Sequence, residues 1–224
     1  EREAHLKEMD RLKTGFFTNI SHELRTPMTV VAGRLQTILH AEADEKRKNS
    51  LSIVLRNAER VSSLVTQLLD FRKIEEGKIQ VVATLGDLAS LLRDWTASLQ
   101  VLAEQKEITL SIKHPEVCNG QFDFDKVQKI FINLLSNAIK YTNDGGEVHV
   151  VLNVEEDQRV RFIIEDNGLG ISPEHLEHIF DRFYRVSEES MAQGAGIGLN
   201  LTKELVDLLG GEISVESPIS EDPD

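Results

Sequence analysis

A histidine is followed at once by a glutamate in the segment ISHELRTP at residues 20–27, and this pair is a candidate for chemistry. His22 lies two residues from the apolar Ile20 and Leu24, so a rotation of about 100° per residue places it on the polar side of a helix. The carboxylate of Glu23 can hold one ring nitrogen as N–H and accept its proton, which leaves the other nitrogen neutral and nucleophilic. His22 is therefore a candidate phosphate acceptor.

Two other interpretations of this histidine compete with that one. A solvated helix face is the commonest setting for a lone histidine, and Thr26, one turn further on, shares the polar stripe of His22. Pro27 weighs against it, because a proline inside a helix removes a backbone donor and is expected to kink the helix there. A zinc site of the HExxH type is excluded, since the fifth residue of HELRT is Thr26 and the second metal ligand is missing.

A phosphate acceptor needs a phosphate donor, and the segment IFINLLSNAIKYT at residues 130–142 is the best candidate for its binding site. Asn133, Asn137, Lys140 and Tyr141 fall at i, i+4, i+7 and i+8, which is one face of a helix. Each amide alone is compatible with a solvated position. Together these side chains supply hard oxygen ligands for Mg²⁺, a cation and an aromatic edge, which are the groups that a nucleoside triphosphate requires.

A second candidate segment is IIEDNGLGI at residues 163–171, where a strand-like run ends in Asp166, Gly168 and Gly170. A carboxylate can accept a hydrogen bond from the amino group of adenine, and glycines let the backbone turn and approach a flat base. A DxGxG pattern also occurs in ordinary turns, so its function depends on what lies beside it.

Glycines recur in GAGIGLNLTKELV, residues 194–206, directly before a helical pattern. The free N–H groups at the start of such a helix could receive phosphate oxygens. A Rossmann dinucleotide motif is the rival interpretation, but the spacing is GxGxG rather than GxGxxG, and a charged segment precedes it instead of a strand. The sequence also contains no GxxxxGK[ST] stretch, which excludes a P-loop.

Two long amphipathic patterns precede these segments. Apolar residues recur at steps of three and four over residues 6–38 and again over 51–68, and the second pattern stops near Gly77, a typical helix end. The charged stretch at 41–49 is the expected connection. Because two such helices cannot bury their apolar stripes against each other alone, the sequence favours a dimer that forms a four-helix bundle.

From residue 78 onward, short β-like runs alternate with helical patterns, which predicts an α+β layer with helices on one face of a sheet. The expected strands are 78–83, 108–113, 147–154 and 159–166, and the expected helices are 87–104, 123–141, 173–179 and 198–209. The sequence therefore predicts a helical domain at 1–77 and an α+β domain at 78–224.

The charge balance argues against partners that are polyanions. The chain has 38 acidic and 25 basic residues, a net charge of -13, and so no overall basic footprint for nucleic acid or anionic lipid. Its one cysteine, Cys118, cannot form an internal disulfide, which is typical of a reducing compartment such as the cytoplasm. No uncharged apolar run approaches the roughly 20 residues of a membrane span. We expect a cytoplasmic segment of a longer protein, with a membrane receptor as one candidate.

In this order, the motifs resemble those of the cytoplasmic kinase core of bacterial sensor histidine kinases of two-component systems. FFTNISHELRTP is similar to the phosphoacceptor box, NLLSNAIKYT to the asparagine box and DNGLGI to the first glycine box. FDRFYRV resembles the phenylalanine box, and GAGIGLNLTKELV resembles the second glycine box. The resemblance implies a dimeric bundle for histidine phosphotransfer, followed by an ATP-binding α/β sandwich of the type shared with Hsp90, MutL and gyrase.

The resemblance also implies a role for each matching residue. His22 would be the phosphoacceptor, Glu23 the base that assists it, and Thr26 the residue that orients water when phosphate is removed from the response regulator. For the metal, it implies Asn137 as the main Mg²⁺ ligand with Asn133 in support. For the nucleotide, it implies that Lys140 contacts the phosphates, with Arg182 and Arg185 near them, that Tyr141 lines the site and that Asp166 binds adenine. The residues implied to shape the pocket are Gly168, Gly170, Gly194, Gly196, Gly198 and Leu199.

The function expected from this resemblance is ATP-dependent autophosphorylation of His22 and transfer to an aspartate on the receiver domain of a response regulator. Phosphatase activity toward the regulator and an upstream, membrane-anchored sensor domain are further expectations. One departure is that GGEISVES is not followed by the family's last strand before Asp224. An Hsp90-like ATPase and a nucleotide-binding module without catalysis are the rival functions. The long helices that carry His22 disfavour the ATPase, and the intact His22, Glu23 and Asn137 disfavour the inactive module.

Overall fold

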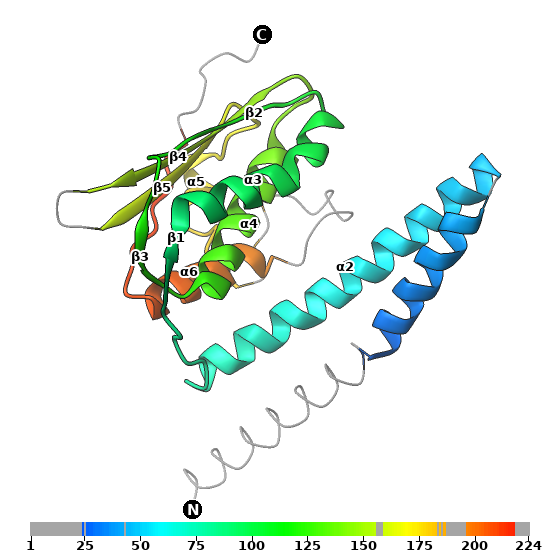
Figure 1. The fold of residues 1–224 in the computed structure, drawn as a ribbon, viewed down its shortest axis with the longest axis horizontal. Helices are drawn as coiled ribbons and strands as arrows, with labels where there is room; N and C mark the ends of the chain where they lie inside the picture. The colour runs from blue at the N-terminus through cyan, green and yellow to red at the C-terminus, as the bar shows by residue number, and fades with distance from the viewer. Residues whose placement is uncertain are drawn as a thin grey trace, which may run out of the picture. The chain divides into compact units, whose positions relative to one another are not determined.

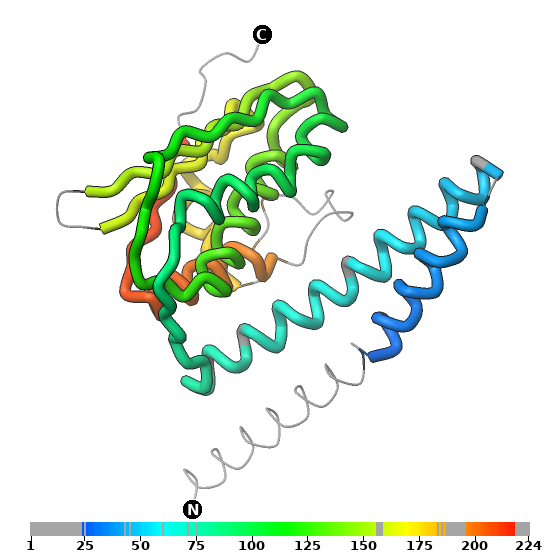
Figure 2. Tube along the Cα trace, in the orientation of Figure 1, coloured from blue at the N-terminus to red at the C-terminus, as the bar shows by residue number. Residues whose placement is uncertain are grey.

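The chain divides by its contacts into two compact units, Glu1–Ile79 and Gln80–Asp224. The structure is a computed structural model, and Figures 1 and 2 show it. It describes Leu24, residues 26–42, 44–155 and 159–182, Tyr184, Val186 and residues 196–217, without the side chains of Glu45, Arg60, Phe71 and Glu75.

The first unit is a helical hairpin. A helix covers residues 26–41, and α2 (Glu45–Glu75) runs back beside it (Figure 1). Asp44 caps the start of α2, because its Oδ1 accepts a hydrogen bond from the N–H of Arg47 at 3.0 Å. The predicted connection at 41–49 is therefore too long. Lys46, Arg47 and Lys48, which follow the cap, are exposed on the helix, so their charges remain in solvent.

The end of α2 is fixed by its backbone. Gly77 has a φ of 61° and donates its N–H to the carbonyl of Ile74 at 2.8 Å, while the N–H of Lys78 donates to the carbonyl of Lys73 at 2.9 Å. This pair of bonds is a Schellman motif, in which glycine adopts the left-handed conformation without steric cost. The helix end predicted near Gly77 is confirmed.

The second unit has the predicted α+β class. In chain order its elements are β1 (Thr84–Asp87), α3 (Leu88–Glu104), β2 (Thr109–Lys113), β3 (Asn119–Phe122), α4 (Phe124–Tyr141), β4 (Glu147–Val154), β5 (Val160–Asp166), α5 (Pro173–Leu176) and α6 (Gly198–Leu208). β1 and β3 form an antiparallel pair. β4 is the central strand of a second sheet, parallel to β2 and antiparallel to β5.

Helices α3 and α4 cover one face of the three-stranded sheet (Figure 1). Val148 and Val150 of β4 are buried under them and alternate with more exposed residues, because successive side chains of a strand point to opposite faces. Phe131 of α4 is fully buried, with its ring centre 6.0 Å from that of Trp95 on α3 and 5.6 Å from that of Phe162 on β5. The core of this unit therefore lies between the two helices and the sheet.

The strands predicted at 108–113, 147–154 and 159–166 are confirmed, and so are three of the four predicted helices. α5 is a single turn and shorter than the predicted 173–179. Among the described residues, no helix combines the length and the apolar character that crossing a bilayer requires.

The strand predicted at 78–83 is wrong. Val81 and Val82 are exposed, and the N–H of Val82 donates to the carboxylate of Asp123 at 2.7 Å rather than to a neighbouring strand. The strand pair forms further along the chain, between β1 and β3. β3 escapes prediction because its sequence NGQF has no β-branched residue and includes glycine and asparagine, which are rare in strands.

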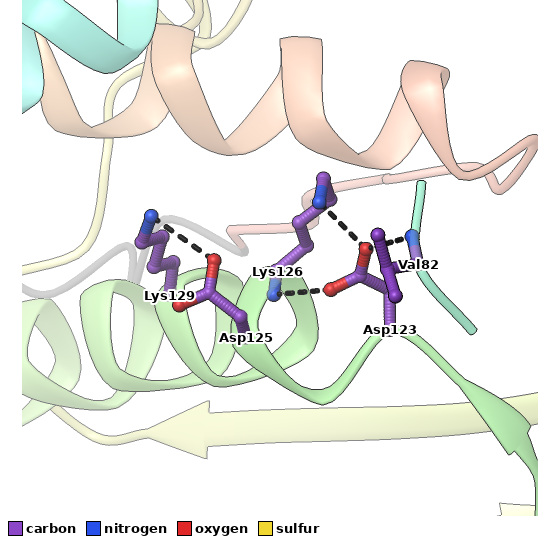
Figure 3. Close-up of polar contacts among 5 residues, drawn as sticks. All are labelled: Val82, Asp123, Asp125, Lys126 and Lys129. Atoms are coloured by element: carbon purple, nitrogen blue, oxygen red, sulfur yellow. Dashed lines mark hydrogen bonds and ion pairs between the residues drawn. The ribbon is translucent and has the colours of Figure 1, made fainter. Parts of the chain in front are cut away.

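Asp123 caps α4 and anchors the segment that leads into β1 (Figure 3). Its Oδ1 accepts the N–H of Lys126 at 3.2 Å, and its Oδ2 accepts the N–H of Val82 at 2.7 Å and the ammonium of Lys126 at 2.6 Å. Burial raises the pKa of Asp123, but the Lys126 ammonium and the two N–H groups lower it by more. The pKa of this carboxyl therefore lies below its ordinary value.

Asp123→Asn is expected to destabilise the second unit by about 3 kcal/mol at neutral pH, because it leaves the buried Lys126 ammonium without its counter-charge. Folding lowers the pKa of Asp123, so the ionised carboxylate stabilises the folded state. This stabilisation is complete above the unfolded-state pKa of about 4, and it is lost as the pH falls through the lower pKa of the folded state. The difference in unfolding free energy between parent and variant, measured by urea denaturation at a series of pH values, is therefore expected to shrink below that pH.

Asp125→Asn is the matched control for this experiment. Asp125 lies in the same helical turn, and its carboxylate is 3.1 Å from the ammonium of Lys129 at the surface (Figure 3). Exposed pairs of this kind contribute about 0.2–1 kcal/mol. Equal destabilisation by the two variants, or an effect of Asp123→Asn that does not depend on pH, would contradict the assignment.

Candidate functional site

The second half of α4 carries a polar face with Asn133, Asn137, Lys140 and Tyr141. The side chains of the first three are half-buried, and that of Tyr141 is exposed. The ammonium of Lys140 donates to the hydroxyl of Tyr141 at 2.9 Å and lies 4.5 Å from the centre of its ring. A cation is thus held at the C-terminal end of this face.

Asn133 joins α4 to the start of α6. Its amide nitrogen donates to the hydroxyl of Thr202, a buried residue of α6, at 2.8 Å. A Cβ at Gly198 would lie 2.5 Å from Oδ1 of Asn133, so a larger residue there would require the Asn133 amide to shift. Among the described residues, the start of α6 has no side-chain hydrogen bond from its N-cap residue, Ile197, and uncapped N–H groups at the start of a helix suit an anion.

The turn after β5 docks on the end of α4. The N–H of Leu169 donates to the carbonyl of Tyr141 at 3.2 Å, and a Cβ at Gly168 would lie 2.4 Å from the same oxygen. The exposed Asp166 accepts the N–H of Gly168 at 3.0 Å through Oδ1. Gly170 has a φ of 67°, a conformation that favours glycine. Three predicted segments, far apart in the sequence, therefore meet at α4.

Two protein-family models match the chain. Residues 12–77 match the His Kinase A (phospho-acceptor) domain, and residues 122–222 match the histidine kinase-, DNA gyrase B-, and HSP90-like ATPase. The chain belongs to the ATP-dependent sensor histidine kinases. Both matched domains follow the order and the fold expected from the sequence, with the helical phosphoacceptor region first and the ATP-binding α/β domain second.

Named relatives of this histidine kinase agree with that placement. Sensor histidine kinase TmoS of Ectopseudomonas mendocina is 34% identical over 214 residues, which is 94% of this chain and 22% of TmoS. Sensor protein SrrB of Staphylococcus aureus is 32% identical over 216 residues, which is 94% of this chain and 37% of SrrB. The chain thus spans well under half the length of these relatives.

A solved structure shows the same fold. Full-length ShkA, crystallised in complex with AMPPNP, is similar with a TM-score of 0.71 and 24% sequence identity. The similarity covers 88% of this chain and 41% of ShkA. The predicted succession of a helical hairpin and an α/β domain is therefore confirmed.

The structure of this histidine kinase brings together most of the predicted nucleotide-binding residues but describes few of the predicted catalytic ones. The residues in the three segments that meet are Asn133, Asn137, Lys140, Tyr141, Asp166, Gly168, Gly170, Gly196, Gly198 and Leu199. His22, Glu23, Arg185 and Gly194 lie outside the described residues. Thr26 is exposed on the helix of the first unit, and the guanidinium of Arg182 lies 3.9 Å from the carboxylate of Glu204 on α6.

Sequence reasoning missed three polar residues that shape the candidate site. Thr202 orients Asn133, and its position four residues after Gly198 was a usable signal, because that spacing places both on one helix face. Asn167 accepts the N–H of Glu147 at 2.8 Å through its side-chain oxygen, and the buried Asn200 donates to the carbonyl of Phe180 at 2.9 Å. Their positions inside the segments DNGLGI and GAGIGLNLTKELV were the available signal, although neither asparagine was given a role.

The donor set of the candidate site suits a hard cation. In the described part of the chain, no group of three or more His, Cys, Asp or Glu side chains is arranged to hold a metal ion. The side chain of Asn137 makes no hydrogen bond to another described residue, and that of Asn133 is oriented by Thr202. Amide oxygens with few other protein ligands fit Mg²⁺, which keeps several waters and binds together with substrate phosphates.

Proposed function

We propose that the chain autophosphorylates His22 from Mg-ATP and passes the phosphoryl group to an aspartate of a response regulator. The observation that supports this most strongly is the junction of the asparagine face of α4 with the uncapped start of α6, where Gly198 is packed against Asn133. Amide oxygens, a cation and helix N–H groups there suit a triphosphate with its metal.

Each predicted nucleotide-binding residue except Arg182 has a part in this proposal. Asn137, supported by Asn133, holds Mg²⁺, which neutralises charge on the phosphates. Lys140 contacts a phosphate, Tyr141 lines the nucleotide site and Asp166 accepts the amino group of adenine. The residues that complete the pocket are Gly168, Gly170, Gly194, Gly196, Gly198, Leu199 and Arg185.

The phosphoryl step depends on alignment more than on any single contact. A neutral ring nitrogen of His22 attacks the γ-phosphorus, the bond from that phosphorus to the bridging oxygen breaks, and ADP leaves. Glu23 accepts the proton from the other ring nitrogen. Thr26 orients the water that hydrolyses the phospho-aspartate of the regulator when the same protein acts as a phosphatase.

We propose residues 1–77 as the dimerisation and phosphotransfer domain and 78–224 as the ATP-binding domain. Apolar side chains remain exposed on both helices of the first unit, among them Val31 and Ile38 on one and Val54 and Val61 on the other. A second hairpin would bury them in a four-helix bundle. Because the chain spans only part of its relatives, we further propose that it is the cytoplasmic core of a longer receptor with a membrane-anchored sensor.

Incubation of the chain with γ-labelled ATP and Mg²⁺ tests the central proposal. Label that is lost in acid and retained in alkali is expected, because that stability is characteristic of a phosphohistidine. ATP hydrolysis without bound label would identify an Hsp90-like ATPase instead, and nucleotide binding without either activity would identify a non-catalytic module. Addition of a receiver domain is then expected to move the label from the kinase to the regulator.

A further inference from the structure

Lys106 lies in the turn that follows α3, and its side chain contacts the end of α4. The ammonium donates to the carbonyl of Ile139 at 3.1 Å and to that of Lys140 at 3.0 Å, and it also donates to the carbonyl of Thr142. An ammonium has three donors, so these contacts use all of them. The side chain that makes them is half-buried.

These contacts complete the C-terminus of α4, where the last carbonyls of a helix have no partner inside the helix. The carbonyl of Ala138 accepts both the N–H and the hydroxyl of Thr142, at 3.0 and 2.7 Å. The carbonyl of Tyr141 accepts the N–H of Leu169 in the turn after β5. Lys106 takes the remaining carbonyls, and its positive charge also suits the negative end of the helix dipole.

Lys106 is itself held in place by its backbone. Its N–H donates to the carbonyl of Ala103 at 3.0 Å, and its carbonyl accepts the N–H of Gly145 at 2.9 Å. The chain between α4 and β4 is thus bound by the backbone of this lysine, while the end of α4 is bound by its ammonium. One residue therefore fixes both the end of the helix and the turn that leaves it.

We propose that Lys106 is a positioning residue of the nucleotide site. By fixing the last turn of α4, it sets the places of Lys140 and Tyr141, and of the turn after Asp166 that docks on the Tyr141 carbonyl. Lys106 acts through backbone carbonyls and contacts none of the side chains assigned to ATP. The inference rests on the proposed function, since the end of α4 matters here as a wall of the ATP site.

The test compares four forms of the full chain: the parent, Lys106→Met, Lys106→Arg and the control Lys113→Met, which alters an exposed lysine of β2. The dissociation constant for Mg-AMPPNP is measured by calorimetry, at a temperature at which each form is folded. Lys106→Met is expected to weaken binding by about tenfold, as loss of a supporting partner does. Lys106→Arg, which keeps the charge and several donors, is expected to recover most of the affinity. The control is expected to match the parent.

A second measurement separates positioning from stability and does not need nucleotide. The exchange rate of the Leu169 amide hydrogen is expected to rise in Lys106→Met. This amide bonds the Tyr141 carbonyl, which lies between the two carbonyls of Lys140 and Thr142 that Lys106 holds. Parental affinity and parental exchange in a folded Lys106→Met would overturn the proposal, even if its melting temperature fell. If the parent binds no nucleotide, the proposed function fails and the exchange rates alone decide the role of Lys106. Lys106→Gln replaces Lys106→Met should that variant not fold.

Discussion

His22→Gln is expected to reduce incorporation of label from γ-labelled ATP to background while leaving the affinity for Mg-AMPPNP unchanged. Glutamine keeps the polarity of the position but has no nucleophilic nitrogen that can form the phosphoramidate bond. Because the proposed ATP site lies in the second unit, loss of the acceptor removes the chemical step and not the binding step. Phosphoryl incorporation and nucleotide titration, done on the same preparation, measure the two effects separately.

The control for this substitution is His40→Gln. His40 is an exposed histidine of the helix at residues 26–41, and its Nδ1 lies 2.8 Å from the carbonyl of Gln36. This variant is expected to incorporate label like the parent. Acid-labile label that persists in His22→Gln would show that another histidine is the acceptor and would overturn the assignment.

Gly168→Ala is expected to weaken nucleotide binding by about 10- to 100-fold, because a lost hydrogen bond to a charged group such as the Asp166 carboxylate costs about 1.5–3 kcal/mol. The added Cβ would lie 2.4 Å from the carbonyl oxygen of Tyr141 and 2.8 Å from Oδ1 of Asp166. The first of these atoms belongs to the backbone of α4 and cannot move aside as a flexible side chain would. The turn must therefore lift from α4, which breaks the hydrogen bond of Leu169 and displaces Asp166.

Titration with Mg-AMPPNP, together with the melting temperature, checks this result. Gly33→Ala is the matched control, because a Cβ there would meet nothing within 4 Å and the residue lies inside a helix. That change is expected to stabilise the first unit by up to about 1 kcal/mol and to leave nucleotide affinity unchanged. If Gly168→Ala bound nucleotide as tightly as the parent, the docked turn could not be a wall of the site.

The helices that carry the site could be predicted from the sequence, because the same helical periodicity places the apolar residues on the buried face and the polar site residues on the opposite face. In α4, the spacing that buries Ile130, Phe131 and Leu135 also places Asn133 and Asn137 on the polar face. The bounds of α4 were predicted to within one residue for the same reason. Strand β4 was equally clear, since an apolar residue occupies every second position from Val148 to Val154.

What the sequence left unpredicted depends on contacts between distant segments. The ammonium of Lys106 meets carbonyls more than 30 residues further on, and no local pattern distinguishes it from a surface lysine. The pairing of β1 with β3 is equally hidden, because neither TLGD nor NGQF has the composition of a strand. The amide of Val82 is bound by a carboxylate, so a run of valines that suggests a strand forms none.

The bond between Val82 and Asp123 also sets the length of the tether between the two units. The Schellman motif holds the chain as far as Lys78, and the carboxylate holds it again from Val82, so only Ile79, Gln80 and Val81 lie between the two anchored points. These residues extend to about 14 Å at most from Lys78 to Val82 and contain about six soft backbone dihedrals. Any reorientation of the ATP-binding unit with respect to the end of α2 must be made within those few rotations. Loss of the Asp123 carboxylate would lengthen the tether without inserting a residue.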